Sequence, residues 1–203
     1  MANINAPFGL RPIRYTSGAP YNGAANKYFA PSTYATNLFI GDPVIKTGTS
    51  NTTFTRGYNI GTLAEINKAT AGTTNRTTGV IVGFEPVSGA ETAVYGAAST
   101  ARIVLVADDP NLLFECQDDG GAALAATTVG LNAVYIFTNA GSTVTGRSGV
   151  QIDAGTTTAP ATTVGFQLEL VRVSNKPNND VGANAIWEVR INQHTETNNS
   201  TGI

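Results

Sequence analysis

Short apolar runs, each closed by turn residues, dominate the chain from residue 38 onward. The segments 166–170 (FQLEL) and 187–191 (WEVRI) alternate between apolar and polar residues, a period of two that is typical of strands with one buried and one solvated face. The run 102–107 (RIVLVA) is apolar on both faces, which predicts a central strand. Further strands are expected at 38–40, 44–46, 63–69, 79–84, 112–116 and 133–137. The pattern predicts an all-β protein, either a β-barrel or a jelly-roll-like sandwich.

Two strands carry a predicted irregularity. Gly83 interrupts the run 79–84 and indicates a bulge or a close backbone approach. After Leu170 the alternation slips by one residue, because two valines now flank Arg172, and such a slip is typical of a β-bulge. The one helix candidate, 121–129, is short and ends in β-branched residues, so one or two turns is the most that we expect.

Residues 1–37 differ from the rest, because prolines recur too often for a helix while large apolar side chains are frequent. We expect an extended, irregular N-terminal arm that lies on a surface, either its own barrel or a neighbouring subunit. A β domain would then cover 38–194, and the polar C-terminal tail 195–203 is expected to be flexible. The residues of the arm that we expect to contact a partner are Phe8, Leu10, Arg11, Ile13, Arg14 and Tyr15. Arginine suits interface ion pairs, although two solvated charges on a flexible arm explain Arg11 and Arg14 equally well.

Charge is scarce, since 13% of residues are Asp, Glu, Lys or Arg against about 25% in ordinary domains. The net charge of −2 and the thinly spread basic residues give no reason to expect a nucleic-acid partner. No apolar stretch approaches the ~20 residues of a membrane span, so no membrane partner is expected, and the N-terminus lacks the layout of a signal peptide. So little charge suits a surface covered by a partner or by copies of the chain, but a neutral hydrated surface explains it equally well.

Candidate catalytic residues are few. The chain has one histidine, His194, which argues against a His-based triad or a multi-His metal site, and we expect it on the surface at a strand end. Ser148 does not lie in a G-x-S-x-G elbow, and no phosphate-binding glycine motif occurs. Cys116 lies in an apolar run and is expected to be buried and inert. We therefore expect no catalytic residue, no metal ligand, no cofactor and no enzymatic activity.

Paired acids occur at 108–109 and at 118–119, on either side of a predicted strand. Such oxygens suit calcium or, less readily, the carboxylate pair of a glycosidase. The pairs precede Pro110 and Gly120, where Asp side chains stabilise turns through local hydrogen bonds. A strand of that length would also hold them ~17–26 Å apart, so turns are the favoured interpretation.

Several strings along nearly the whole chain resemble a group of tailed-bacteriophage virion proteins, namely head cement or decoration proteins: NAPFGLRPIRYTSGAPYNGAANKYF, LFIGDPVIKTG, TTGVIVGFEP, STARIVLVADDPNLLFECQDDG, TTVGLNA, TVTGRSGVQID and NAIWEVRINQH. The resemblance implies a non-enzymatic capsid protein, made in the host bacterial cytoplasm and placed on the outer surface of the virion head. Its implied partners are the major capsid protein and other copies of itself, as a homodimer or homotrimer.

Two other functions stay open at this point. One is a head fibre or another carbohydrate- or receptor-binding β module, in which exposed aromatic side chains would form the platform; Trp187 follows the strand alternation and is expected in the core, which weighs against this function. The other is a polysaccharide-cleaving enzyme, which the spacing of the acids makes the weakest of the three.

Overall fold

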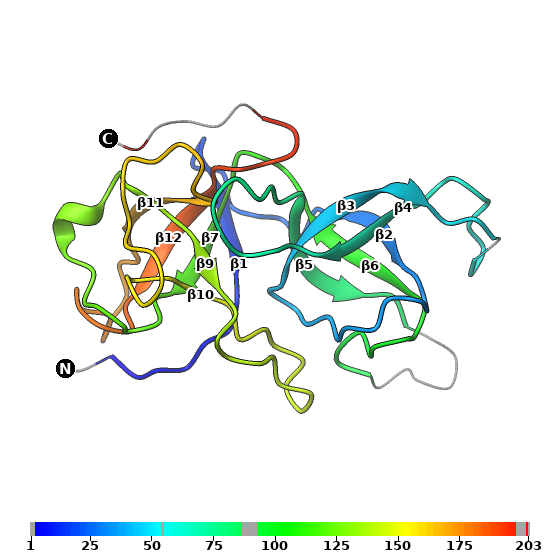
Figure 1. Ribbon diagram of the computed structural model, residues 1–203, viewed down its shortest axis with the longest axis horizontal. Coiled ribbons are helices and arrows are strands. Elements are labelled where there is room, and N and C mark those ends of the chain that lie inside the picture. Colours follow the sequence, from blue (N-terminus) through cyan, green and yellow to red (C-terminus); the bar gives the residue numbers. More distant parts are fainter. Residues whose placement is uncertain (1–2, 54, 87–92, 198–201, 203) are drawn as a thin grey trace.

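The structure is a computed structural model that describes residues 3–53, 55–86, 93–197 and 202. It confirms the all-β prediction, since strands are joined by loops and the only helical segment in the described part of the chain is the 3-10 turn Ala126–Thr128. Two β lobes lie side by side along the long axis of the molecule (Figure 1). Among the described residues, no helix has the length and apolar character needed to cross a bilayer.

One lobe is a closed barrel, which lies on the right in Figure 1. Its strands follow the order β2-β4-β3-β5-β6 around the barrel. They are β2 (Asn26–Ala30), β3 (Pro43–Ser50), β4 (Ala64–Lys68), β5 (Gly79–Phe84) and β6 (Arg102–Ala107). Closure leaves no free edge to pair with another chain, and apolar side chains such as Val44, Ile66 and Val104 fill the interior.

The other lobe is built on a five-stranded antiparallel sheet in the order β1-β7-β12-β11-β8. The strands are β1 (Arg11–Tyr15), β7 (Leu112–Gln117), β12 (Ile186–Ile191), β11 (Leu168–Val173) and β8 (Asn132–Ala133). A short ladder of β9 (Tyr135–Ile136) and β10 (Gln151–Ile152) lies beside it. The predicted alternation holds, because Trp187 and Val189 are fully buried in the core while Glu188 and Arg190 lie on the opposite face of the sheet, where both form ion pairs.

The largest apolar core lies where the lobes meet. Phe114 and Trp187 from the five-stranded sheet share it with Val80 and Ala107 from the outer face of the barrel. Strand β5 is therefore buried on both faces, with Val80 toward this junction and Ile81 toward the barrel interior. Each large side chain buried in this way contributes roughly 1.5–3 kcal/mol, so the junction holds the lobes together as one body. Cys116 is buried in the same core, as predicted.

Both predicted bulges are present. The register of β5 against β6 shifts between Ile81 and Gly83, and the register of β11 against β12 shifts between Leu170 and Arg172. The second bulge turns Val173 inward toward the core and leaves Arg172 outward beside Glu188.

The expected irregular arm, residues 1–37, needs correction. Residues 1–2 lie outside the described part of the chain, and residues 3–10 are extended without regular pairing, but residues 11–15 form β1 and residues 26–30 form β2. Pro12 is compatible with a strand here because β1 lies at the edge of its sheet. Leu10 is 1% exposed, so the surface that this segment covers is that of its own chain. Residue 38 therefore does not separate an arm from a domain.

The prediction for His194 is wrong, because the residue is completely buried. After β12 the chain enters the junction, where Thr77 pairs with His194 in a parallel bridge and also bonds Gln193 and Thr195 through its backbone. Of the expected tail 195–203, residues 198–201 and 203 lie outside the described residues. Glu196 forms an ion pair with Lys46 on the barrel at 2.5 Å.

Candidate functional site

Strand β1 places two arginines on the same outer face of the five-stranded sheet. Arg11 lies opposite Glu115 of β7 and Arg14 lies opposite Leu113, with a register shift between them. Residues three apart on a regular strand point to opposite faces, but Ile13 is the extra residue of a bulge and resets the alternation. Both guanidinium groups therefore lie over the solvent side of the sheet.

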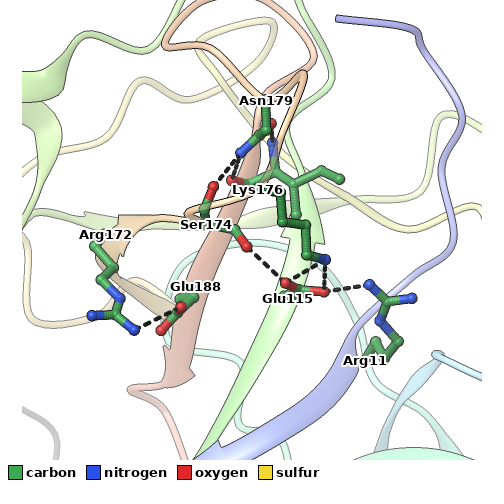
Figure 2. A network of polar contacts seen from close by, with 8 residues as sticks. Arg11, Glu115, Arg172, Ser174, Lys176, Asn179 and Glu188 are labelled. Carbon is green, nitrogen blue, oxygen red and sulfur yellow. Dashed lines mark hydrogen bonds and ion pairs between the residues drawn. The ribbon is translucent and has the colours of Figure 1, made fainter.

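Glu115 is the centre of one polar network on this face (Figure 2). Its carboxylate accepts hydrogen bonds from Arg11, from Lys176 at 2.5 Å and from the Ser174 hydroxyl at 2.7 Å. The carboxylate side chain is only 5% exposed, whereas Arg11 is 50% exposed. The network thus holds one edge of the Arg11 guanidinium in place and leaves the rest of the group accessible.

Glu188 is the centre of a second network on the neighbouring strand β12. It accepts from Arg14 at 2.6 Å and from Arg172 at 2.9 Å, and it lies directly opposite Glu115 in the register. One row further along the sheet, Arg190 pairs with Glu169 at 2.5 Å. We call these eight side chains the charged face: Arg11, Arg14, Glu115, Glu169, Arg172, Lys176, Glu188 and Arg190.

Charged residues are scarce in this chain, and the charged face holds a large share of the basic ones. It holds five of the twelve Lys and Arg residues and three of the fourteen Asp and Glu residues, which gives it two excess positive charges. The whole chain carries −2, so the rest of the molecule carries −4. An asymmetry of this kind steers a partner of opposite charge toward one face.

The pKa values of the two central carboxylates show that both are ionised at neutral pH. Burial raises the pKa of Glu115, but the hydrogen bonds from Lys176, Arg11 and Ser174 outweigh burial, so this pKa lies below its ordinary value. The pKa of Glu188 is lowered in the same way, since the bonds from Arg172 and Arg14 outweigh its burial. A carboxylate held in the ionised form by several donors is a structural anchor and not a general acid.

An apolar cleft opens next to the charged face, where the chain before β1 crosses the barrel. Gly9 and Gly41 meet backbone to backbone: a Cβ on Gly41 would lie 2.7 Å from the Phe8 carbonyl oxygen, and both glycines have a positive φ. The Leu10 N–H donates to the Gly41 carbonyl at 3.0 Å. Only glycine permits this close crossing, which forms one wall of the cleft.

The cleft has a volume of about 240 Å³. The Arg11 guanidinium lies over the Phe8 ring at its mouth, 4.9 Å from the ring centroid, and the exposed Arg147 lines it from the β9–β10 loop. The full lining is Phe8, Leu10, Arg11, Pro12, Tyr21, Ile40, Gly41, Ile81, Val82 and Arg147. The cleft is therefore an apolar hollow between two arginines.

The six residues expected to contact a partner do not form one site. Phe8, Leu10 and Arg11 line the cleft, while Arg14 belongs to the charged face. The other two lie elsewhere: the half-buried Ile13 is the bulge residue, and Tyr15 packs against the main core and lines a separate polar hollow with Asp108 and Asp109.

Sequence reasoning missed Arg147, Ile40 and Lys176. Arg147 and Ile40 line the cleft and Lys176 pairs with Glu115, and each comes from a part of the chain distant from β1. The only signal that the sequence offered was the Gly- and Ser-rich segment around Arg147, whose composition is typical of a surface loop.

Three of the four paired acids stabilise local turns, as favoured from the sequence, whereas Asp108 accepts hydrogen bonds from the side chains of Asn26 and Tyr28 on β2. Asp118 accepts the backbone N–H groups of Gly120, Asn184 and Ala185 within 2.6–3.0 Å, and burial raises its pKa. Asp109 accepts the N–H of Asn111 at 2.7 Å. Within the described ranges, no three His, Cys, Asp or Glu residues are grouped closely enough to hold a metal ion.

Ser148 also has a structural role. It is 1% exposed and donates to the buried Asp42 carboxylate at 2.5 Å, while Lys68 pairs with the same carboxylate at 2.9 Å. The three residues fasten the β9–β10 loop to the barrel.

Comparison of the chain with protein-family models, with curated proteins and with solved structures found no match.

Proposed function

We propose that this chain is a non-enzymatic cement protein that binds the outer surface of a tailed-bacteriophage head and stabilises the lattice of the major capsid protein. The strings along the chain that resemble head cement proteins support this proposal, as does the all-β fold. The proposal includes assembly with copies of itself, as a homodimer or homotrimer, on the virion.

The observation that carries the proposal is the apolar cleft beside the charged face. Protein interfaces combine an apolar centre with a polar rim in which arginine is enriched, and the two surfaces of this chain match those two parts. The rim side chains are already held by ion pairs with Glu115 and Glu188, so less conformational entropy is lost when a partner binds. A surface built this way favours tight binding over turnover.

Clamping follows from such binding by mass action. A protein that binds the assembled shell more tightly than the separate subunits stabilises the shell by RT ln(1 + [L]/Kd), about 2.7 kcal/mol per site at a concentration of 100 Kd. The rigid junction between the lobes, with Phe114 and Trp187 fully buried, transmits this stabilisation across the contact without deforming.

No observation favours a carbohydrate-binding module. Its platform would use clustered exposed tryptophan and tyrosine side chains, and the one tryptophan of the chain, Trp187, is 0% exposed, which weighs against this function. Glycan binding by the purified protein would favour the carbohydrate-binding module over the cement function.

The test uses heads of the phage that encodes this chain, prepared with and without it. We expect the protein in purified virions, and we expect heads that lack it to release their DNA at a lower temperature. Addition of purified protein should restore the original release temperature, whereas bovine serum albumin at the same concentration should not. Equal heat resistance of the two preparations, or absence of the protein from purified virions, would overturn the proposal.

A further inference from the structure

The cleft continues into an exposed apolar patch on the barrel side. Ile40 lines the cleft and is 38% exposed, and its N–H donates to the Gly146 carbonyl at 2.8 Å. The turn that contains Gly146 packs against the backbone of Val94, which is 43% exposed, and carries Val144, which is 86% exposed. In Figure 1 this turn projects below the junction of the lobes as part of the β9–β10 loop. Adjoining exposed apolar side chains of this kind mark a contact surface.

The cleft is positively charged and has no acidic residue in its lining. Arg11 engages Glu115 through one nitrogen, and a guanidinium has five N–H donors. Arg147 is exposed, and its side chain makes no ion pair within the described ranges of the chain. The Arg147 guanidinium and the edge of the Arg11 guanidinium that Glu115 does not engage therefore lie beside an apolar floor, where they can donate to a carboxylate from a partner.

The size of the cleft indicates what kind of group enters it. At about 240 Å³ it is smaller than the ~300–1,000 Å³ of small-molecule pockets, and it suits a side chain or two of a larger partner. The Gly9–Gly41 crossing fixes its wall through backbone contacts, so the cleft is formed before the partner arrives.

We infer that the cleft binds a segment of the capsid subunit in which a carboxylate lies next to a large apolar side chain. The apolar side chain packs against Phe8 and Ile40, and the carboxylate accepts hydrogen bonds from Arg147 and from the free edge of Arg11. This inference rests on the proposed function for the identity of the partner, while the chemistry of the segment follows from the lining. The remainder of the charged face then forms the rim of the contact.

The first experiment measures sedimentation of purified protein with heads that lack it. Arg147→Glu should weaken binding at least about tenfold, because reversal of a charge paired in an interface costs more than 1.4 kcal/mol. Arg147→Lys should weaken it less, because lysine keeps the charge but loses the bidentate geometry. The matched control is Arg56→Glu, the same change at an exposed arginine in the β3–β4 connection of the barrel, and it should change binding less than about twofold.

The second experiment places the photo-cross-linker p-benzoylphenylalanine at position 40. After irradiation of reconstituted heads, we expect cross-links to a capsid segment that has Asp or Glu within two positions of Leu, Ile, Phe or Met. Cross-links to a second copy of this chain, or to a segment without a carboxylate, would overturn the inference. Tight binding of wild-type protein with unimpaired binding of Arg147→Glu would also overturn it and leave the cement function standing. Failure of the wild-type protein to bind heads at all would overturn the proposed function itself.

Discussion

Replacement of Glu115 by glutamine tests whether the polar network on the outer face stabilises the five-stranded sheet. The substitution keeps the shape of the side chain but removes the charge that Arg11 and Lys176 surround. In the wild-type protein the Ser174 hydroxyl lies 2.7 Å from a Glu115 carboxylate oxygen. In the variant it would donate to an amide oxygen, which is a weaker acceptor than a carboxylate. The carboxylate is only 5% exposed, so water does not replace the lost interactions.

The magnitude follows from the exposure of each partner. A hydrogen bond such as that from Ser174 contributes about 0.5–1.5 kcal/mol. Arg11 is 50% exposed and Lys176 is 36% exposed, so solvent screening reduces each ion pair to about 0–1 kcal/mol. Glu188 lies opposite Glu115 in the register. The substitution removes the repulsion between these two negative charges, which offsets a small part of the lost stability. We expect Glu115→Gln to lower the free energy of unfolding by about 1–3 kcal/mol at pH 7.

The pH dependence of this difference is the sharper part of the prediction. The pKa of Glu115 in the folded protein is lowered from its ordinary value of 4.5. A lowered carboxylate pKa gives stability that is fully present above the unfolded pKa and is lost as pH falls through the folded pKa. The difference between wild type and Glu115→Gln should therefore be constant near neutrality and should shrink as the pH drops below about 4.5.

The assay is urea unfolding followed by the fluorescence of Trp187. This residue is the only tryptophan, is fully buried, and lies opposite Cys116, next to Glu115 on β7, so it reports on the sheet in question. The control is Glu196→Gln, which breaks an ion pair that is exposed on both sides and should have a much smaller effect. A difference for Glu115→Gln that is below 0.5 kcal/mol, or that stays the same down to acid pH, would refute this account of the network.

Three further outcomes follow from the fold. Phe114→Ala should cost about 3–5 kcal/mol in chemical unfolding, because it leaves a cavity in the core that joins the lobes; a cost below 1 kcal/mol would show that this core is not tightly packed. Gly41→Ala should lower the Tm more than Gly48→Ala, because both positions have a positive φ but only Gly41 has no room for a Cβ; equal Tm values would contradict the close crossing. Burial lowers the pKa of His194 from its ordinary 6.5, so the unfolded chain binds the proton more readily and stability should fall as the pH drops below about 6.5. That decrease should be absent in His194→Gln, as measured by Tm between pH 7 and 5, and its persistence would assign it to other groups.

Local periodicity accounts for the parts of the fold that were predictable. The one-residue change in the apolar–polar alternation after Leu170 and the glycine at position 83 predicted two bulges that the structure contains. Such a prediction is possible because a bulge changes the phase of alternation within the strand itself. The two-sided apolar run 102–107 likewise predicted a central strand, and β6 has a partner on each side, β2 and β5, with all but one of its residues buried. In each case the sequence pattern and the bulge or strand that it predicts lie in the same few residues.

The cleft and the charged face were not predictable, because they depend on which strands become neighbours. Glu115 meets Lys176, 61 residues further along the chain, and Gly9 meets Gly41 across the two lobes. A period of two determines which face a side chain occupies, but not which strand lies beside it. The same reason explains His194: its sequence looks like the polar end of a strand, and only the pairing with Thr77 buries it.

The placement of β1 couples folding to binding in this protein. A docking arm could be removed without harm to the body, but Leu10 is buried in the main core and β1 pairs with β7 along its length. Deletion of residues 1–15 would therefore expose the edge of β7 and open the core, and a loss of capsid binding after such a deletion would not distinguish a lost contact from a damaged sheet. The partner-binding role of this segment can be separated from its structural role only at side chains that reach solvent. Arg147 meets that condition, since its side chain lines the cleft and is exposed, and its backbone pairs only in an isolated bridge with Ile40. For this reason the binding hypothesis is best tested there and not at the N-terminus.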